Sequence, residues 1–185
     1  MEILDLVDES GRPTGRTAAR AQVHRLGLCH RTSHVWVLRR REGRWQVLLQ
    51  KRSEGKDSFP GCWDCSSAGH IPAGVDFVPS ALRELREELG ISAAIRRPLW
   101  LNQGFFTEDV DQLRYHELCL YFLIDFAGTD LLARGRSFRR DEGVHSHQFT
   151  WLPFESLVDA YFYPIFLKRE IFHLPEQLTL RTEVE

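Results

Sequence analysis

The sequence predicts a single α/β domain in which a mixed β-sheet is sandwiched between α-helices. Segments typical of strands and helices interleave along the 185 residues, and no linker, internal repeat or low-complexity tract divides them. A chain of this length can bury a core without disulfides or a structural metal. We therefore expect one domain over residues 1–175 and a loose C-terminal tail over residues 176–185.

Most of the expected elements are short strands. Runs rich in β-branched and aromatic residues, bounded by glycine, proline or polar turns, are typical of strands. Such runs occupy residues 3–7, 34–39, 45–51, 63–68, 100–105, 118–126 and 149–152. The polar run 40–44 joins the second and third of them as a hairpin. Residues 55–61 and 69–74 are expected to be loops, and residues 17–24 fit either a short helix or a loop.

Three segments predict helices. The clearest covers residues 82–89 and ends at Gly90, because glycine is favoured just past the end of a helix. Residues 154–161 and 163–172 form the other two, and Pro164 stands at the start of the last one, where proline is tolerated.

The composition excludes several classes of function. A net charge of −2 provides no basic surface for nucleic acid. The N-terminus lacks the basic and apolar segments of a signal peptide, and no apolar stretch reaches the ~18 residues that span a bilayer. We therefore expect a cytoplasmic protein without nucleic-acid or membrane partners.

Cys62 and Cys65 form a CxxC pair among the four cysteines, and no second such pair follows. A structural zinc site needs four ligands, usually at paired spacings. Thiols in a reducing cytosol are therefore the favoured interpretation.

The helix expected over residues 82–89 carries two distinct faces, because positions three and four apart lie on the same side. Its apolar stripe consists of Leu82, Leu85 and Leu89, and its acidic side consists of Glu84, Glu87 and Glu88. Crowded like charges repel by roughly 0.2–0.5 kcal/mol per pair. A divalent cation removes that cost and prefers such hard oxygen ligands. The alternative is a solvated charged face on which Arg83 pairs with Glu87.

The surrounding residues favour the metal. GHIPAGVDFVPSALRELREELGI, from Gly69 to Ile91, matches the 23-residue Nudix box with one departure. That box is a glycine, five residues, a glutamate, seven residues, then Arg-Glu-apolar-any-Glu-Glu-any-Gly-apolar. Here Val75 stands where the first glutamate belongs, and Asp76 comes one place late. The chain therefore resembles the Nudix hydrolases.

A wider likeness points to one branch of that family. Three strings, LVDESGRPTG (6–15), VHRLGLCHRTSHVWVL (23–38) and KDSFPGCWDCSSAGH (56–70), resemble isopentenyl-diphosphate isomerase. Together with the box they cover most of residues 3–126. The C-terminal third is covered only weakly.

The resemblance implies a Nudix fold and cleavage of a pyrophosphate bond in a nucleoside diphosphate derivative or a similar small diphosphate. It implies that Glu87 and Glu88 bind Mg²⁺ or Mn²⁺, that Glu84 is a ligand or the base that activates water, and that the carbonyl of Gly69 completes the shell. Such a metal orients the diphosphate and acidifies a bound water, whose proton a carboxylate within hydrogen-bond reach can accept. It also suggests a homodimer.

The departure at Val75 bears on activity. The family glutamate at this position typically pairs with the arginine that is Arg83 here, which valine cannot do. Asp76 is the available substitute. A weakened enzyme, or a non-catalytic domain that senses a nucleotide, therefore stays open as an alternative.

Further candidates lie outside the box. Glu117, expected to have a catalytic role, and Glu142 are the acids that could assist at the metal. The candidates for contact with substrate phosphates are Lys51, Arg52, Lys56 and His70.

The residues that match the isomerase give an incomplete set. His24, His30 and His70 match its metal positions, but Tyr115 replaces one of its acids, so phosphate contact or a structural role is favoured over a second metal. Ala68 replaces the cysteine that transfers a proton in the isomerase. The nearest thiol, Cys65, lies three residues earlier, and in an extended strand this odd offset turns it to the opposite face. We therefore expect hydrolysis, with isomerisation as the alternative.

Overall fold

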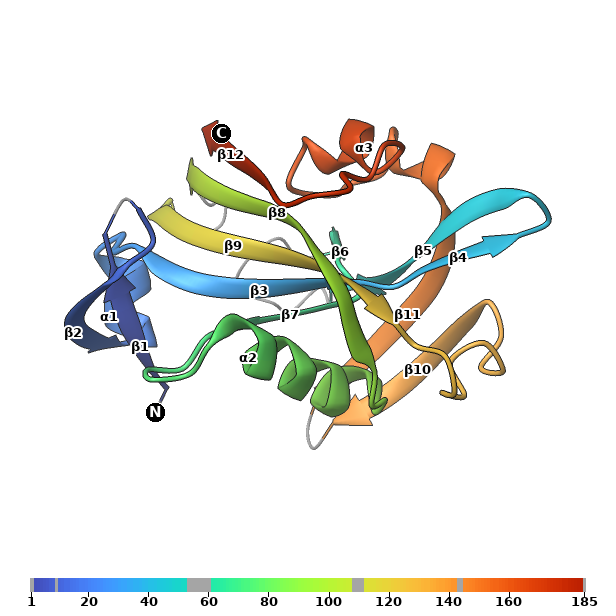
Figure 1. The fold of residues 1–185 in the computed structure, drawn as a ribbon, viewed down its shortest axis with the longest axis horizontal. Helices are drawn as coiled ribbons and strands as arrows, with labels where there is room; N and C mark the ends of the chain where they lie inside the picture. Colours follow the sequence, from blue (N-terminus) through green and yellow to red (C-terminus); the bar gives the residue numbers. More distant parts are fainter. Residues whose placement is uncertain (1, 9, 53–60, 108–111, 143–144, 185) are drawn as a thin grey trace.

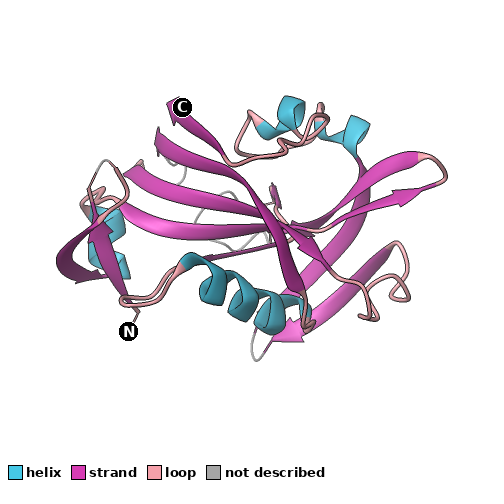
Figure 2. Cartoon of the chain, viewed as in Figure 1, coloured by secondary structure: helices cyan, strands magenta, loops and turns pink. Residues whose placement is uncertain are grey.

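The computed structural model describes residues 2–8, 10–52, 61–107, 112–142 and 145–184 (Figures 1 and 2). The first half of the chain contains β1 (Ile3–Val7), β2 (Pro13–Ala19), α1 (Arg20–Arg25), β3 (His30–Trp36), β4 (Leu38–Arg41), β5 (Arg44–Lys51), β6 (Trp63–Asp64), β7 (Ser67–His70), α2 (Phe77–Glu84) and the π-helix η1 (Leu85–Leu89). The second half contains β8 (Ala94–Thr107), β9 (Arg114–Asp125), β10 (Ser137–Glu142), β11 (His145–Pro153), the 3₁₀-helix η2 (Phe154–Leu157), α3 (Leu167–Glu170) and β12 (Thr179–Val184).

The strands form two five-stranded sheets and a separate hairpin. One sheet has the order β12-β8-β9-β3-β7, with parallel pairing of β12 to β8 and of β3 to β9 and antiparallel pairing elsewhere. The second has the order β10-β11-β5-β4, with β6 added to β5. The hairpin pairs β1 with β2. The expected mixed α/β fold is confirmed.

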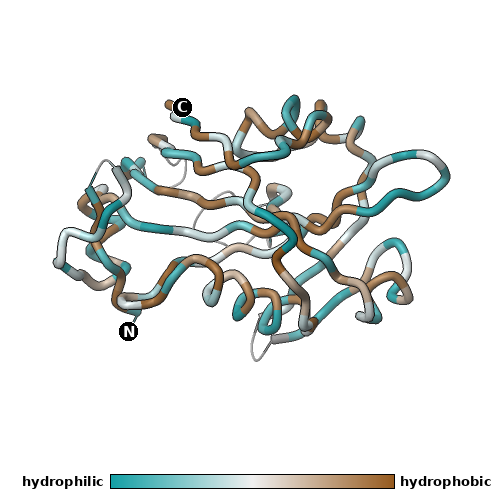
Figure 3. Tube along the Cα trace, in the orientation of Figure 1, coloured by the Kyte–Doolittle hydropathy of each residue, from teal (hydrophilic) through white to brown (hydrophobic). Residues whose placement is uncertain are grey.

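Two apolar cores lie on opposite sides of the strands. Val35 and Val37 belong to the core that contains Leu85 and Leu89 of η1. Trp36 stands between these two valines in the sequence, so its side chain points to the other side of the strand. It belongs to the core beneath η2 and α3. Figure 3 shows how apolar and polar residues alternate along α2 and η1, while the tip of the β4–β5 hairpin is hydrophilic. The strands are thus covered by helices on both sides, as expected.

The helix of the acidic face begins at Phe77, earlier than the expected residue 82. The carboxylate of Asp76 accepts a hydrogen bond from the backbone N–H of Phe77 (3.1 Å), and Pro79 falls in the first turn, where its missing N–H costs nothing. The helix ends where predicted, at Gly90, whose φ of 64° is the left-handed conformation that glycine adopts most easily. Asp76 therefore acts as the N-cap of the helix.

The C-terminal tail is not loose. Residues Thr179–Val184 form β12, which pairs in parallel with β8 from Trp100 to Phe105. The expectation was wrong because backbone pairing holds this strand while its side chains bury little: Leu180 is 73% exposed and Val184 is 78% exposed. Apolar patterning therefore gave no signal.

Other boundaries also differ from the expectation. Residues 17–24 divide between β2 and α1, the strand expected over 34–39 is split at Val37, and the two C-terminal helices shorten to η2 and α3. Strand β10 had not been expected. None of the described helices is long and apolar enough to cross a bilayer. The assignment of residues 1–175 to one domain stays a prediction.

Candidate metal centre and catalytic site

The predicted metal ligands Gly69 and Glu84 lie against each other. Strand β7 carries Gly69 past α2, and a Cβ atom at this position would overlap the carboxylate of Glu84. Glycine is therefore required here because the carboxylate occupies the space that any side chain would need. The fold thus brings a backbone carbonyl donor and a carboxylate into one place, as a hard-cation site requires.

Arg83 is held by two glutamates of its own helix. Its guanidinium donates to Glu84 and, across one turn, to Oε2 of Glu87 (2.6 Å). The partner that Val75 cannot supply is therefore replaced from within the helix. Asp76 does not substitute for it, because its carboxylate bonds to the backbone N–H of Phe77. Glu87 is half-exposed, whereas Glu84 is largely covered.

Glu88 points toward strand β7 instead. Its Oε2 accepts a hydrogen bond from the backbone N–H of Ala68 (3.3 Å). Burial raises the pKa of Glu88 to about 8; its hydrogen bonds with Ser67 and Ala68 lower the pKa, and the nearby carboxylates of Glu84 and Asp64 raise it. Burial also raises the pKa of Glu84 to about 7, although Arg83 opposes this shift.

These raised pKa values test whether the site suits a cation. A buried carboxylate without a cationic partner is destabilised in its charged form, and a divalent ion reverses that effect. The donor set of carboxylates and a backbone carbonyl consists of the oxygen ligands that Mg²⁺ and Mn²⁺ prefer. The residues present therefore fit the metal that the sequence implies. In this structure, however, the described oxygens of Glu84, Glu87 and Glu88 do not all lie within 4.8 Å of one another.

The loop that leads into α2 is braced from the N-terminal hairpin. Arg31 is 7% exposed and donates to Oδ2 of Asp5 on β1 (3.0 Å) and to the carbonyl of Val75 (3.1 Å). Its guanidinium lies over the ring of Phe77, 5.5 Å from the centroid. The same Asp5 oxygen accepts from the N–H of Gly74 (2.8 Å). No local sequence pattern indicates this brace, which joins three separate segments.

A second cluster lies on one shared face of β3, β7 and β9, opposite to the face on which Gly69 meets Glu84. The register of β3 and β9 places His30 opposite Glu117, with Nε2 and Oε1 3.5 Å apart. The rings of His24 and His70 approach at 3.0 Å between their Nε2 atoms. Ligand atoms of all four residues lie within 4.8 Å of one another, which is a geometry that can hold a metal ion. The histidines singled out in the sequence are thus brought together with Glu117.

The charges in this cluster are set by burial and pairing. Burial raises the pKa of Glu117, but the hydrogen bond and charge of His30 and the interactions with His70 and His34 lower it, and the net pKa lies well below the usual range. The contact with Glu117 raises the pKa of His30 in spite of burial. Burial lowers the pKa of His70 to about 3, so its ring is neutral near pH 7. His70 therefore offers a phosphate a neutral N–H at most.

The basic candidates on and after β5 already have partners. The ammonium group of Lys51 donates to the carbonyl of Gly61 and lies 4.9 Å from the centroid of the Trp63 ring. Arg52 forms an ion pair with Asp64 (2.8 Å). Lys56 lies outside the described residues, and the side chain of Glu142 is likewise not described.

The thiol of Cys65 does not lie on the opposite face, contrary to the expectation. His34 pairs with Ala68 across β3 and β7, so their side chains lie on one face, and Sγ of Cys65 is 3.5 Å from Nδ1 of His34. The simple alternation fails because the chain is irregular between β6 and β7. Together with Asp64 these residues form a further group of close ligand atoms. No local sequence pattern singles out His34 and Asp64, because only the pairing register brings them to this site.

Comparisons with known proteins define the class to which this fold and site belong. A model of the NUDIX domain matches residues 30–172. Nudix hydrolase 3 of Arabidopsis thaliana is 52% identical over 90 residues, which are 49% of this chain and 11% of that protein. Isopentenyl-diphosphate Delta-isomerase 2 of Photorhabdus laumondii is 34% identical over 96 residues, 52% of each chain. A solved structure from Deinococcus radiodurans has a TM-score of 0.56 at 20% identity and covers 89% of this chain and 94% of its own.

This chain belongs to the Nudix family, and its fold is the Nudix fold. The resemblance to both the hydrolases and the isomerase branch is confirmed. The matched segment spans about half of the isomerase and about a tenth of the Arabidopsis protein.

Proposed function

We propose that the protein is a metal-dependent hydrolase that cleaves the pyrophosphate bond of a nucleoside diphosphate derivative or a similar small diphosphate. The observation that carries this proposal is the pair of buried carboxylates, Glu84 and Glu88, packed against the glycine strand of the Nudix box. Both pKa values are raised, as is expected where buried carboxylates lie close together and no divalent cation compensates their charge.

The residues proposed to hold Mg²⁺ or Mn²⁺ are Glu84, Glu87, Glu88 and the carbonyl of Gly69. When bound, the ion would neutralise the diphosphate and lower the pKa of a bound water. Arg83 has the complementary task of keeping Glu84 and Glu87 aligned on one side of the helix.

Glu84 is proposed either as a ligand or as the general base, because an ion bound to its carboxylate would lower its pKa. In the second role it is a better candidate than Glu117. A base works best when its pKa lies near the working pH, and burial places that of Glu84 at about 7. Glu117 is held ionised by His30, so it is a poor proton acceptor. We therefore propose that Glu117 orients the histidine cluster.

Substrate phosphates would be bound by Arg52, with Lys51 and Lys56 as further cations. The guanidinium of Arg52 is paired with Asp64, whose charge also acts on Glu88, so it lies near the carboxylates. Bidentate contact with phosphate is the common use of such a group. A cytoplasmic location and a homodimer stay predictions.

The isomerase is a weaker second candidate. It is favoured by the contact between Cys65 and His34 on the face of Ala68. Against it, the thiol is 3% exposed and also donates to the carbonyl of Ser67 (3.2 Å), so a substrate carbon has little access to it.

The test is a panel of nucleoside diphosphate derivatives incubated with Mg²⁺, with and without excess EDTA, and assayed for release of nucleotide. Hydrolysis that chelator abolishes is expected. Glu155→Gln, which removes an exposed glutamate on η2, serves as the control for Glu88→Gln. Saturable nucleotide binding without turnover would replace this proposal by a sensor domain.

A further inference from the structure

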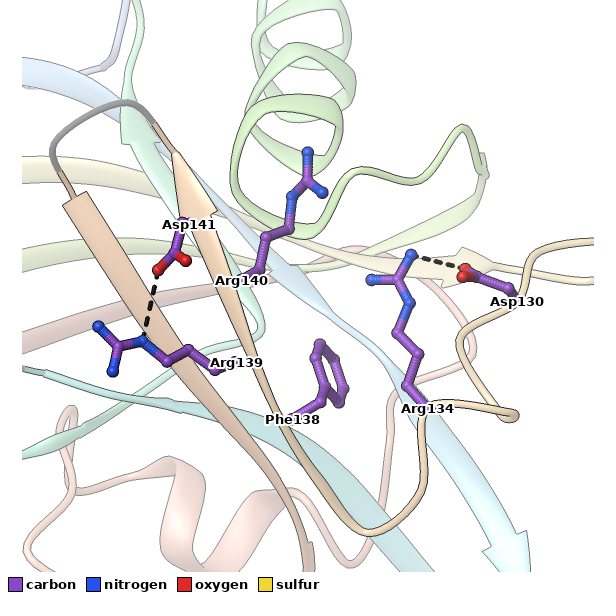
Figure 4. A pocket seen from close by; sticks show the side chains of 6 residues that line it. All are labelled: Asp130, Arg134, Phe138, Arg139, Arg140 and Asp141. Atoms are coloured by element: carbon purple, nitrogen blue, oxygen red, sulfur yellow. Dashed lines mark hydrogen bonds and ion pairs between the residues drawn. The ribbon is translucent and has the colours of Figure 1, made fainter.

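An open hollow of about 530 Å³ lies along the free edge of β10, beside the end of η1. No residue proposed for the metal or for catalysis lines it. The lining residues are Asp130, Arg134, Phe138, Arg139, Arg140 and Asp141 (Figure 4). Three guanidinium groups and two carboxylates leave one positive charge in this hollow, although the chain as a whole carries a net charge of −2.

Two of the three arginines are already paired. Arg134 forms an ion pair with Asp130 (2.6 Å) and donates to the carbonyl of Leu89 at the end of η1 (2.7 Å). Arg139 pairs with Asp141 (3.3 Å), and both of these side chains are more than two thirds exposed. The two aspartates are therefore occupied.

In the described part of the chain, Arg140 is the one guanidinium group of the three for which no hydrogen bond or ion pair is found, although its charge acts on Asp130. Its Nε is buried and finds no partner among the described residues. Its guanidinium packs against Gly90, where any Cβ atom would overlap it. A buried donor left unsatisfied is destabilising, and more so in a charged group.

Stabilising the end of the helix does not account for Arg140. A cation at a helix C-terminus can compensate the exposed carbonyls. Arg134 already does this through Leu89, whereas Arg140 lies against the same turn without bonding to a carbonyl of the described chain. The guanidinium groups of Arg134 and Arg140 therefore both lie at the end of η1, and that of Arg140 has N–H donors available for a ligand.

We propose that this hollow is a phosphate-binding site in which Arg140 is the principal cation and Arg134 the second. The planar fork of a guanidinium matches two phosphate oxygens at once. Phe138 fixes the site, because its ring stacks on Phe149 with centroids 5.2 Å apart and lies 5.4 Å from the guanidinium of Arg134.

The phosphate has two possible sources. It is either a phosphate of the diphosphate substrate that lies beyond the bond to be cut, or a free phosphate ester. Only the first source rests on the proposed hydrolase function. It is considered because the hollow begins where η1, the helix proposed to bind the metal, ends. Binding by itself requires neither metal nor turnover.

In the first experiment, isothermal titration calorimetry measures the binding of pyrophosphate and of phenyl phosphate to the protein in EDTA at low salt. Saturable binding is expected, and Arg140→Gln should weaken it at least ~10-fold, since a charge-assisted contact is lost. Arg140→Lys, which keeps the charge but not the fork, should weaken it less. Arg136→Gln, an exposed arginine of the same segment that does not line the hollow, is the matched control and should change the affinity less than ~2-fold.

Absence of saturable binding by the wild-type protein, or equal weakening by Arg136→Gln, would overturn the proposal. A second arm separates the sources: KM for a hydrolysed diphosphate rises in Arg140→Gln if the substrate occupies the hollow and is unchanged if a free ester does. A protein that hydrolyses nothing would refute the proposed function, while the binding experiment would still decide this site.

Discussion

Replacing Arg31 by methionine tests the brace beneath the Nudix box. Methionine keeps much of the apolar stem but removes both hydrogen bonds, to Asp5 (3.0 Å) and to the carbonyl of Val75 (3.1 Å). The side chains of the ion pair are only 8% and 18% exposed, so little water can replace the lost contacts. Breaking a buried pair from one side costs ~3–5 kcal/mol. Asp5 keeps some solvent and the N–H of Gly74, so we expect about 3 kcal/mol, the lower end of that range.

The assay is urea unfolding with extrapolation of the free energy to water. Arg16→Met, an exposed arginine of the same hairpin, is the control and should change stability by less than ~0.5 kcal/mol. A double-mutant cycle with Asp5→Asn isolates the pairwise energy, which should reach ~1 kcal/mol or more for groups in direct contact. A loss in Arg31→Met that is no larger than in Arg16→Met would refute the brace.

Four other outcomes follow from the site. Glu87→Gln and Glu88→Gln should each lower the hydrolysis rate at least ~100-fold with an unchanged circular dichroism spectrum, since each removes a charged ligand; near-wild-type rates in both would place the metal elsewhere. Val75→Glu should keep or raise the rate at limiting Mg²⁺, because a new carboxylate can bind Arg83; a clear loss would mean that the loop needs the valine. In EDTA, the stability contributed by Glu88 is present below pH ~4.5 and lost as pH rises through about 8, because burial raises its folded-state pKa above that of the unfolded chain. The urea midpoints measured at pH 5 and at pH 8.5 should therefore differ more for the wild type than for Glu88→Gln. Equal differences in the two proteins would contradict this assignment. Isopentenyl diphosphate with Mg²⁺ should give no dimethylallyl diphosphate, and its formation at enzyme-like rates, lost in Cys65→Ser, would establish the isomerase instead.

The parts of the fold that were predictable are those encoded locally. The spacing of Leu85 and Leu89 predicted a buried helix stripe, and both side chains are fully buried. The start of that helix was missed although Phe77 and Ala81 continue the four-residue spacing of Leu85 and Leu89 and pack in the same core. Strand β12 was missed because a strand held by backbone pairing needs no apolar pattern.

The candidate site divides in the same way. The proximity of Gly69 to Glu84 followed from the box motif, and that of the histidines followed from the resemblance. The contact from Arg31 to Val75 spans 44 residues and depends on how β3 passes the loop, which no local pattern encodes. The position of Cys65 depended on an irregular turn between two short strands.

The N-terminal hairpin extends the working unit beyond the stretch that the family model recognises. That match begins at residue 30, yet β1 contributes Asp5 to the brace, a bridge from Leu4 to Pro72 and a carbonyl of Ile3 that accepts from the N–H of Ala73 (2.9 Å). The conformation of the loop between the glycine and the glutamates of the motif is therefore fixed by contacts with residues that belong to no motif. A fragment that began at the boundary of the family match would keep every residue of the motif but would lose the contacts that hold this loop in place.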